Sequence, residues 1–204
     1  MHAVAASEAL LGHYAGPSET SQCSHTGCAV RSRDEPLYRC TECFRSFALC
    51  KTHIVDGHNN LPFHAVQRWD SEKGCWRRCS LGSLGLELHL GHNGSPCIYS
   101  HRGRATVVVH ENGIHSIKIR YCGCLDNKDD EPTQLLRVQL WPASWGRPET
   151  AFTFGVLKTF RLLTVLANTN AYDCFRYLAE LTDDVLPDEC PVSGGKPAIY
   201  LIEC

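Results

Sequence analysis

The feature that most constrains this chain is a series of eight Cys and His residues at metal-ligand spacing within 42 positions near its N-terminal end. Zinc binds four Cys or His ligands tetrahedrally, and a two-residue gap lets one tight turn present two ligands to one ion. Eight unrelated residues at such spacing are improbable, so the series predicts two metal sites. The ligands form four pairs: Cys23-x4-Cys28, Cys40-x2-Cys43, Cys50-x2-His53 and His58-x5-His64.

The order of the four pairs predicts a cross-brace, in which alternate pairs share an ion. One zinc would be bound by Cys23, Cys28, Cys50 and His53, and the other by Cys40, Cys43, His58 and His64. The opening gap leaves one alternative, because His25-x2-Cys28 has the tighter spacing and His25 would then replace Cys23. Apolar residues are sparse between Ser21 and Trp69, so metal must supply the stability that burial cannot.

A third and looser group of potential ligands follows. Asn112-Gly113 between two β-branched runs predicts a hairpin with strands at about 104–110 and 114–121. Such a hairpin would return its far end to the residues that precede it and complete one Cys3His zinc site. The predicted ligands are His92, Cys97, Cys122 and Cys124, with His115 as the alternative to His92 if its side chain turns inward.

The other cysteines carry no predicted chemistry. Cys75 and Cys79 flank Trp76 in a basic segment and are expected to pack, and Cys174 is expected to be a buried apolar residue on a helix. Cys190 and Cys204 have no partner that spacing identifies. No Cys is set apart from the ligand clusters beside a suitable His, so a catalytic cysteine is not expected.

Composition indicates how many domains the chain can form and in which cellular compartment it is expected. The 204 residues, 43% of them hydrophobic, suffice for one or two small domains. The chain shows neither a secretory signal nor a membrane span, so an intracellular, reducing location is expected, where clustered cysteines bind metal rather than form disulfides. Residues 1–124 carry 13 Lys and Arg against 10 Asp and Glu, a net +3, which gives nucleic-acid binding only weak support.

The segments after the ligand clusters predict an α+β fold. We expect a small ZZ-like cross-brace zinc module, then a zinc-stapled β-hairpin and sheet region, then two C-terminal helices. Gln134 to Leu140 alternates loosely and is predicted to be a strand. One helix is expected to begin at Thr150 or Thr153 and end near Ala167, and a second to be capped by Asn170.

These predictions imply four segments. Residues 1–20 are expected to be a disordered tail and residues 21–69 the cross-brace module. Residues 70–186 would hold the α+β region with the hairpin and the third zinc site. Residues 187–204, with Pro and Gly-Gly, are expected to be a loosely packed tail.

Many spaced motifs occur here in one order, and together they resemble the cysteine-cluster (CxC-type) domain of KDZ (Kyakuja, Dileera, Zisupton) transposases. The resemblance covers about residues 21–186. Its first motifs are Leu37-Tyr38-Arg39-Cys40-x2-Cys43-Phe44, Leu49-Cys50-x2-His53, His58, Leu61-Pro62-Phe63-His64 and Trp69. Its later motifs are Leu84-Gly85-Leu86, Leu90-Gly91-His92-x-Gly94, Cys97, Asn112-Gly113-Ile114-His115, Tyr121-Cys122-x-Cys124, Gln134-Leu135-Leu136-Arg137, Trp141-Pro142-Ala143, Pro148-x-Thr150-Ala151-Phe152-Thr153-Phe154, Tyr172-Asp173 and Leu181-Thr182-Asp183.

The resemblance implies a zinc-chelating module that lies N-terminal to a DDE-type transposase core. The given sequence ends where that catalytic part would begin, and Asp183-Asp184 and Asp188-Glu189 are adjacent acids rather than the separated carboxylates of a two-metal site. Enzyme activity is therefore not expected. Cys75 and Cys79 stand where the family would have aromatic or hydroxyl residues, which argues against a fourth ligand pair.

The leading hypothesis is a non-catalytic, nuclear zinc protein with three structural ions that recognises DNA or chromatin. Trp69 and Trp76 would stack on bases. The alternative is a protein-interaction module that binds a histone tail or a partner peptide through the ZZ-like finger, or a non-functional transposon fragment. Neither a membrane nor a small-molecule substrate is expected as a partner. Candidates for phosphate contacts are Arg31, Arg33, Arg39, Arg45, Lys51, Arg68, Lys73, Arg77 and Arg78.

Overall fold

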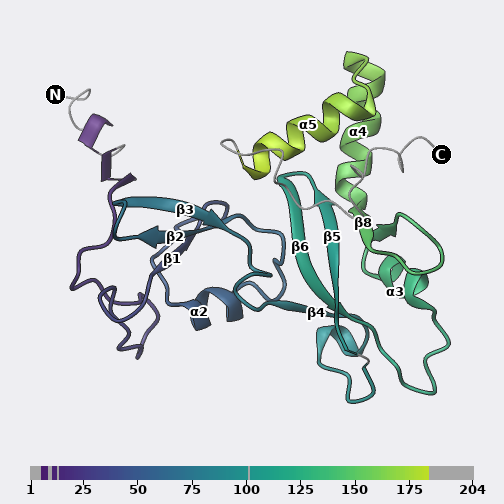
Figure 1. The fold of residues 1–204 in the computed structure, drawn as a ribbon, viewed down its shortest axis with the longest axis horizontal. Helices are drawn as coiled ribbons and strands as arrows, with labels where there is room; N and C mark the ends of the chain where they lie inside the picture. The colour runs from purple at the N-terminus through teal and green to yellow at the C-terminus, as the bar shows by residue number, and fades with distance from the viewer. Residues whose placement is uncertain (1–5, 9–10, 13, 101, 184–204) are drawn as a thin grey trace. The chain divides into compact units, whose positions relative to one another are not determined.

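The computed structural model of the chain describes residues 6–8, 11–12, 14–100 and 102–183 (Figure 1). Its contacts divide the chain into two compact units, Met1–Leu84 and Gly85–Cys204. The elements in chain order are β1 (Tyr38–Cys40), α2 (Lys51–Asp56), β2 (Val66–Asp70), β3 (Cys75–Cys79), β4 (Glu87–His89), η1 (His92–Gly94), β5 (Arg104–His110), β6 (Gly113–Arg120), α3 (Glu131–Arg137), β7 (Leu140–Pro142), β8 (Thr150–Thr153), α4 (Phe154–Ala167) and α5 (Ala171–Thr182).

The first unit is built on a three-stranded antiparallel sheet in the order β1-β2-β3. Gly74, with φ of 63°, supplies the left-handed residue in the turn that joins β2 to β3. This hairpin is not among the predicted elements, and neither of its strands alternates between apolar and polar residues. It crosses the expected boundary at residues 69 and 70, and the first unit extends to Leu84 because β3 pairs back onto β2.

The apolar core of the first unit is small and partly made of ligand residues. One buried cluster consists of Cys23, Leu37 and Cys50, against which Cys28, Val30, Ala48 and Leu49 pack. Two of the three buried members are therefore cysteines. The stability of this core therefore depends on the interactions that its cysteine thiols make.

The second unit contains a five-stranded mixed sheet in the order β4-β6-β5-β8-β7. The predicted hairpin is confirmed: β5 and β6 are antiparallel and pair from Arg104 with Ile119 to His110 with Gly113. Glu87 on β4 forms ion pairs with Lys118, at 2.7 Å, and with Arg120, both on the neighbouring β6. Those two partners, through hydrogen bonds and charge, lower the pKa of the Glu87 carboxyl to about 2.

The strand predicted over Gln134 to Leu140 is wrong, because most of that stretch is helix α3. Asp130 precedes it as N-cap, and its side chain accepts a hydrogen bond from the Thr133 N–H at 2.9 Å. Pro132 lies in the first turn, where its missing N–H costs nothing. Only Leu140, at the end of the stretch, enters a strand, β7.

Both predicted C-terminal helices are confirmed. Thr153 caps α4 by accepting from the Val156 N–H at 3.3 Å, and Asn170 caps α5 by accepting from the Asp173 N–H at 2.8 Å. Thr150, the alternative start of the first helix, lies instead in β8, a short strand that the sequence analysis did not predict. The core beneath the helices consists of Val109, Ile114, Phe152, Val156, Cys174, Leu178 and Ala179.

No helix in the described part of the chain combines the length and the apolar composition that crossing a bilayer requires. The predicted tail at 187–204 lies outside the described residues. The predicted tail at 1–20 contacts the β2-β3 hairpin: Gly16 lies against Trp69, and the Ala15 carbonyl accepts a hydrogen bond from Trp76 Nε1.

Candidate metal centres

The structure brings the twelve predicted ligand residues together in three groups. Within each group, one potential ligand atom from every residue lies within 4.8 Å of all the others. The groups are Cys23, Cys28, Cys50 and His53; Cys40, Cys43, His58 and His64; and His92, Cys97, Cys122 and Cys124. The first two groups interleave along the chain, as the cross-brace requires. Each group could hold one metal ion.

The distances within the groups fit a tetrahedral ion. Zinc bonds of about 2.3 Å to sulfur and 2.0–2.1 Å to nitrogen place tetrahedral ligands about 3.5 Å apart for a sulfur–nitrogen pair and about 3.8 Å apart for two sulfurs. The measured sulfur–nitrogen pairs lie at 3.0 to 3.5 Å and the sulfur–sulfur pairs at 3.6 and 4.0 Å. The sulfurs are too far apart for disulfides, which need about 2.05 Å.

Three of the thiols in these groups have a raised pKa, an effect that a bound cation would oppose. Burial and the neighbouring Cys40 raise the pKa of Cys43 to about 11, and burial with nearby Cys23 and Cys28 does the same to Cys50. The hydrogen bond with Cys97, burial and the neighbouring Cys122 raise the pKa of Cys124 to about 12. Adjacent thiolates repel one another, and a bound cation removes that penalty by stabilising every thiolate around it.

The first centre joins two distant segments of the chain. Cys50 is the N-cap of α2 and His53 lies in its first turn, so the start of the helix presents both side chains to one point. The Cys50 N–H donates to Cys23 Sγ at 3.2 Å. Burial would raise the pKa of Cys23, but N–H groups including that of Cys50 lower it on balance. These N–H groups favour the thiolate form of Cys23, the form that binds metal.

His25, the alternative to Cys23, lies beside the first centre rather than in it. Its ring stacks on that of His53 with centroids 3.8 Å apart and an interplanar angle of 8°. Its Nδ1 atom forms a hydrogen bond with the Thr26 carbonyl at 3.0 Å. The contact supports the ring of a ligand histidine without contributing an atom to the group.

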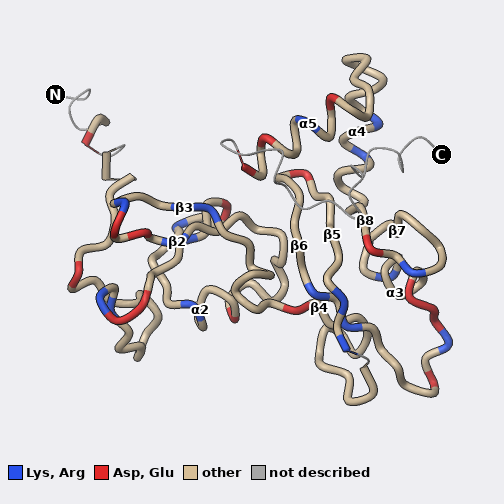
Figure 2. Tube along the Cα trace, in the orientation of Figure 1, with Lys and Arg blue, Asp and Glu red and all other residues tan. Residues whose placement is uncertain are grey.

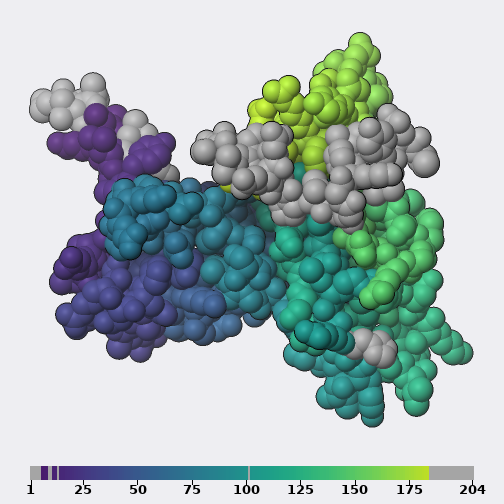
Figure 3. All heavy atoms as spheres, in the orientation of Figure 1, coloured from purple at the N-terminus to yellow at the C-terminus, as the bar shows by residue number. Residues whose placement is uncertain are grey.

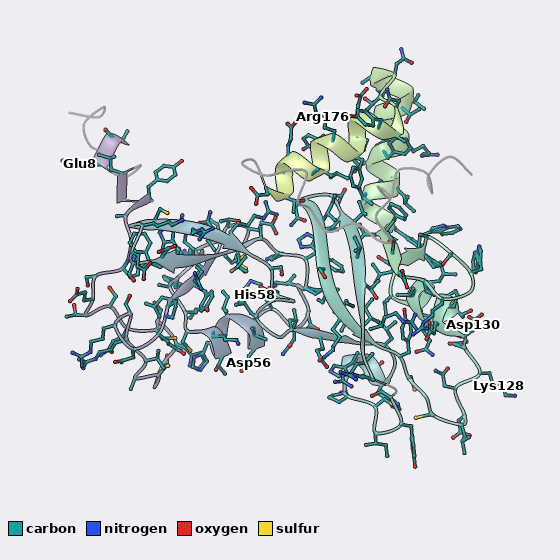
Figure 4. All side chains as sticks on the ribbon, in the orientation of Figure 1. Glu8, Asp56, His58, Lys128, Asp130 and Arg176 are labelled. Carbon is teal, nitrogen blue, oxygen red and sulfur yellow. The ribbon has the colours of Figure 1, made fainter. Side chains whose placement is uncertain are left out.

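In the second centre, a backbone contact sets the orientation of a ligand ring. His58 follows the end of α2 (Figure 4), and its Nδ1–H donates to the Ile54 carbonyl at 2.7 Å. That hydrogen bond fixes the tautomer and leaves Nε2 as the free acceptor, 3.4 Å from Cys43 Sγ. Across the group, Cys40 Sγ accepts from the N–H groups of Glu42 and Cys43 at 3.4 and 3.3 Å, as in a tight ligand turn.

The third centre depends on an unusual backbone. The four residues from Gly91 to Gly94 all have positive φ, at 96°, 48°, 54° and 87°, and they turn the chain after β4 so that His92 faces the end of β6. A Cβ at Gly91 would lie 2.8 Å from the Cβ of Cys122, so only glycine fits there. His92 Nε2 lies 3.4 and 3.3 Å from the thiols of Cys122 and Cys124.

Gln134 is a site residue that the sequence analysis missed. Its Oε1 accepts from the Cys122 N–H at 2.8 Å, and its Nε2 donates to the Cys122 and Asp129 carbonyls at 3.1 and 3.0 Å. The side chain is buried, with 6% of its surface exposed. Helix α3 therefore holds the ligand loop in place, a role hidden by the incorrect strand prediction.

The remaining candidates lie outside the three centres. His115, the alternative to His92, is buried in β6 and donates from Nε2 to the Asn112 side chain at 2.8 Å. Cys174 is buried in the helical core, as predicted. Cys75 is exposed and Cys79 partly buried, and neither belongs to a metal-binding group among the described residues. Cys190 and Cys204 lie outside the described part of the chain.

A family model described as "CxC2 like cysteine cluster associated with KDZ transposases" matches residues 81–186, about half of the chain. The matched region contains the third centre and helices α3, α4 and α5, and the cross-brace lies before it. No curated protein and no solved structure matches.

The first centre yields a test of its ligand set. We expect Cys23→Ala to bind one metal ion fewer than the wild type, because it removes a ligand, and His25→Ala to keep the full number, because it removes only a stacked ring. Native mass spectrometry of the reduced proteins measures this directly. A His25→Ala chain that lacks one ion, beside a fully loaded Cys23→Ala chain, would contradict the assignment.

The third centre yields a test of Gln134. Gln134→Leu preserves most of the side-chain volume but removes its three hydrogen bonds, and we expect the affinity for the third ion to fall about 10- to 100-fold. Competition with a chromophoric chelator measures that affinity. The control is Gln22→Leu, an exposed position in the first unit. Equal affinity in the wild type and Gln134→Leu would show that Gln134 does not position the ligand loop.

Proposed function

We propose, because the chain belongs to the CxC2-like cysteine-cluster family associated with KDZ transposases, that it is a zinc-stapled, non-catalytic module that recognises nucleic acid. The family membership and the three Cys/His groups make it a cysteine-cluster metal-binding module. The choice of zinc, of a non-catalytic role and of nucleic acid as partner is our inference, and so is a nuclear location.

Zinc is the metal that the donor sets favour. The first and third centres each offer three thiols and one imidazole, and the second centre offers two of each. Such Cys3His and Cys2His2 sets with tetrahedral spacing are those of structural zinc sites. Four protein ligands leave no open position at which an ion could activate water, which supports a structural role and a protein without metal-centred catalysis.

One face of the β1-β2-β3 sheet carries the proposal of nucleic-acid binding. Register pairs Arg39 with Gln67, Gln67 with Arg78, and Trp69 with Trp76, so these five side chains lie on the same face. We call this set the tryptophan face. Two indoles flanked by two guanidinium groups combine base stacking with phosphate binding, the two interactions that sequence-tolerant nucleic-acid binders use.

The contacts within the tryptophan face hold its groups in position. The two indoles meet edge to face with centroids 5.3 Å apart. The Arg39 guanidinium lies over the Trp76 ring, 4.4 Å from its centroid, and its Nε donates to the Gln67 side chain at 2.8 Å. Arg78 is exposed at the edge of the same face. A stacked Arg presents its own flat surface to a base.

The other predicted phosphate contacts are distributed more widely (Figure 2). Arg68 and Arg77 are exposed on the opposite side of the sheet, where Arg77 pairs with Asp70 at 3.6 Å. Arg33 pairs with Asp34, also at 3.6 Å, and Arg45 lies over the Phe44 ring. None of these contacts adds an aromatic pair, so the tryptophan face remains the favoured surface.

Peptide binding is a second candidate, favoured by one observation. A groove of about 620 Å³ opens beside the third centre, with Asp126 and Asp129 among its lining residues. Its size suits a side chain or a short peptide segment. This groove belongs to the second unit, whereas the sequence analysis placed the peptide on the ZZ-like finger. Titration with a lysine-rich histone-tail peptide would test it.

Salt dependence and charge removal test the nucleic-acid proposal. We expect the zinc-loaded chain to bind labelled DNA with an affinity that falls as salt rises from about 50 to 200 mM. Replacing Arg39 and Arg78 by Gln removes two phosphate contacts and should reduce the slope of log affinity against log salt by about 2. Fluorescence anisotropy measures both effects.

The matched control is Arg176→Gln, which removes an exposed Arg from α5 in the second unit (Figure 4). It should leave affinity and slope unchanged. Affinity that does not depend on salt, or a double variant that binds like the wild type, would contradict the proposal.

A further inference from the structure

The tryptophan face is covered by the chain's own N-terminal segment. Gly16 lies so close to Trp69 that a Cβ built on it would be 2.0 Å from the Cζ2 atom and 2.1 Å from the Cη2 atom of the indole. The Ala15 carbonyl accepts a hydrogen bond from Trp76 Nε1 at 3.2 Å. We call residues 14–16 the strap. Both tryptophans of the face are therefore engaged by the strap.

Tyr14, the first residue of the strap, interacts with Arg39 of the same face. Burial lowers the pKa of Arg39, and the charge interaction with Tyr14 partly offsets that effect, so the two side chains lie close enough to interact. Strap, indoles and guanidinium thus share one surface. Figure 3 shows the N-terminal residues, in purple, lying against the blue residues of the sheet.

The chemistry of this contact identifies what the strap excludes. The Gly16 backbone lies against the six-membered ring of Trp69, where a flat partner would stack, and the contact requires a residue with no side chain. A nucleobase stacks on an indole in the same way. Bases in a duplex already stack on their neighbours, so only unpaired bases can take that place.

We infer that the strap is an intramolecular competitor for unpaired bases, so that the first unit binds single-stranded nucleic acid on Trp69 and Trp76 when the strap leaves. This inference rests on the proposed function and adds to it the class of ligand and its regulation. The apparent affinity of such a surface is reduced by the fraction of molecules in which the strap is bound. Releasing the strap should therefore strengthen binding.

Gly16→Ala is the test variant, because its methyl group meets the Trp69 ring and displaces the strap. Gly12→Ala is the matched control: a Cβ at Gly12 meets nothing within 4 Å. Both substitutions are made in a chain with Trp141 and Trp145, which are 44% and 62% exposed, replaced by Phe. The remaining tryptophan emission then comes from Trp69 and Trp76.

Two measurements are made on each protein with zinc bound. Acrylamide quenching reports whether the indoles are covered, and fluorescence anisotropy reports binding to a single strand and to the duplex of the same sequence. For Gly16→Ala we expect stronger quenching and an affinity for the single strand at least about fivefold higher, the smallest gain that one stacked base would give. Duplex affinity should change less. Gly12→Ala should match its parent in all three.

The other outcomes separate failure of the inference from failure of the proposed function. Unchanged quenching in Gly16→Ala would show that the strap does not depend on glycine at Trp69, and increased quenching with unchanged single-strand affinity would show that it is no competitor. An equal gain for duplex would overturn the assignment to unpaired bases. If neither parent nor variant binds any DNA, the proposed function fails, and the inference with it.

Discussion

The convergence of four Cys and His side chains on one point, repeated three times, is the constraint on which the rest of the structure depends. In the first unit, Cys23 and Cys50 form most of a buried cluster together with Leu37. Ionised thiols whose sulfur atoms lie 3.6 to 4.0 Å apart repel one another, and a bound cation offsets that repulsion. We therefore expect metal binding and folding of this unit to be coupled.

The third centre shows the same dependence in a different setting. The second unit has a sheet and a helical core of its own, and its ligands come from segments that the sheet brings together at one end. A left-handed run places His92, and Gln134 holds the backbone of Cys122. There the fold positions the ligands, whereas in the cross-brace the ligands organise the fold. Metal loss should therefore affect the two units unequally.

Sequence reasoning predicted the grouping of the ligands because the spacing of ligand residues can be recognised in the sequence before the fold is known. Helix caps at Thr153 and Asn170 and the hairpin at Asn112-Gly113 were predicted for the same reason. The short strands β1, β2, β3, β4 and β8 were missed, since their stability comes from pairing with distant partners. The stretch from Gln134 was misassigned because the cap at Asp130 outweighed a loose alternation.

Positioning residues were the harder part of the site to predict. Gln134 lies in no motif of metal ligands, and its role depends on a helix that brings it to Cys122. The stacking of His25 on His53 likewise could not be predicted from ligand spacing. His25 lies outside the ligand group, and its ring packs against that of His53. The strap on the tryptophan face could not be read from a segment of Ala, Gly and Pro, since Gly16 matters only for its distance to Trp69.

The measurement that tests the account most directly is the number of metal ions per chain, determined by native mass spectrometry while unfolding is followed by circular dichroism during addition of a chelator. The account predicts three zinc ions, with structure in the first unit lost as its two ions are removed. A folded chain that binds no metal, or that keeps its structure after complete removal, would contradict it.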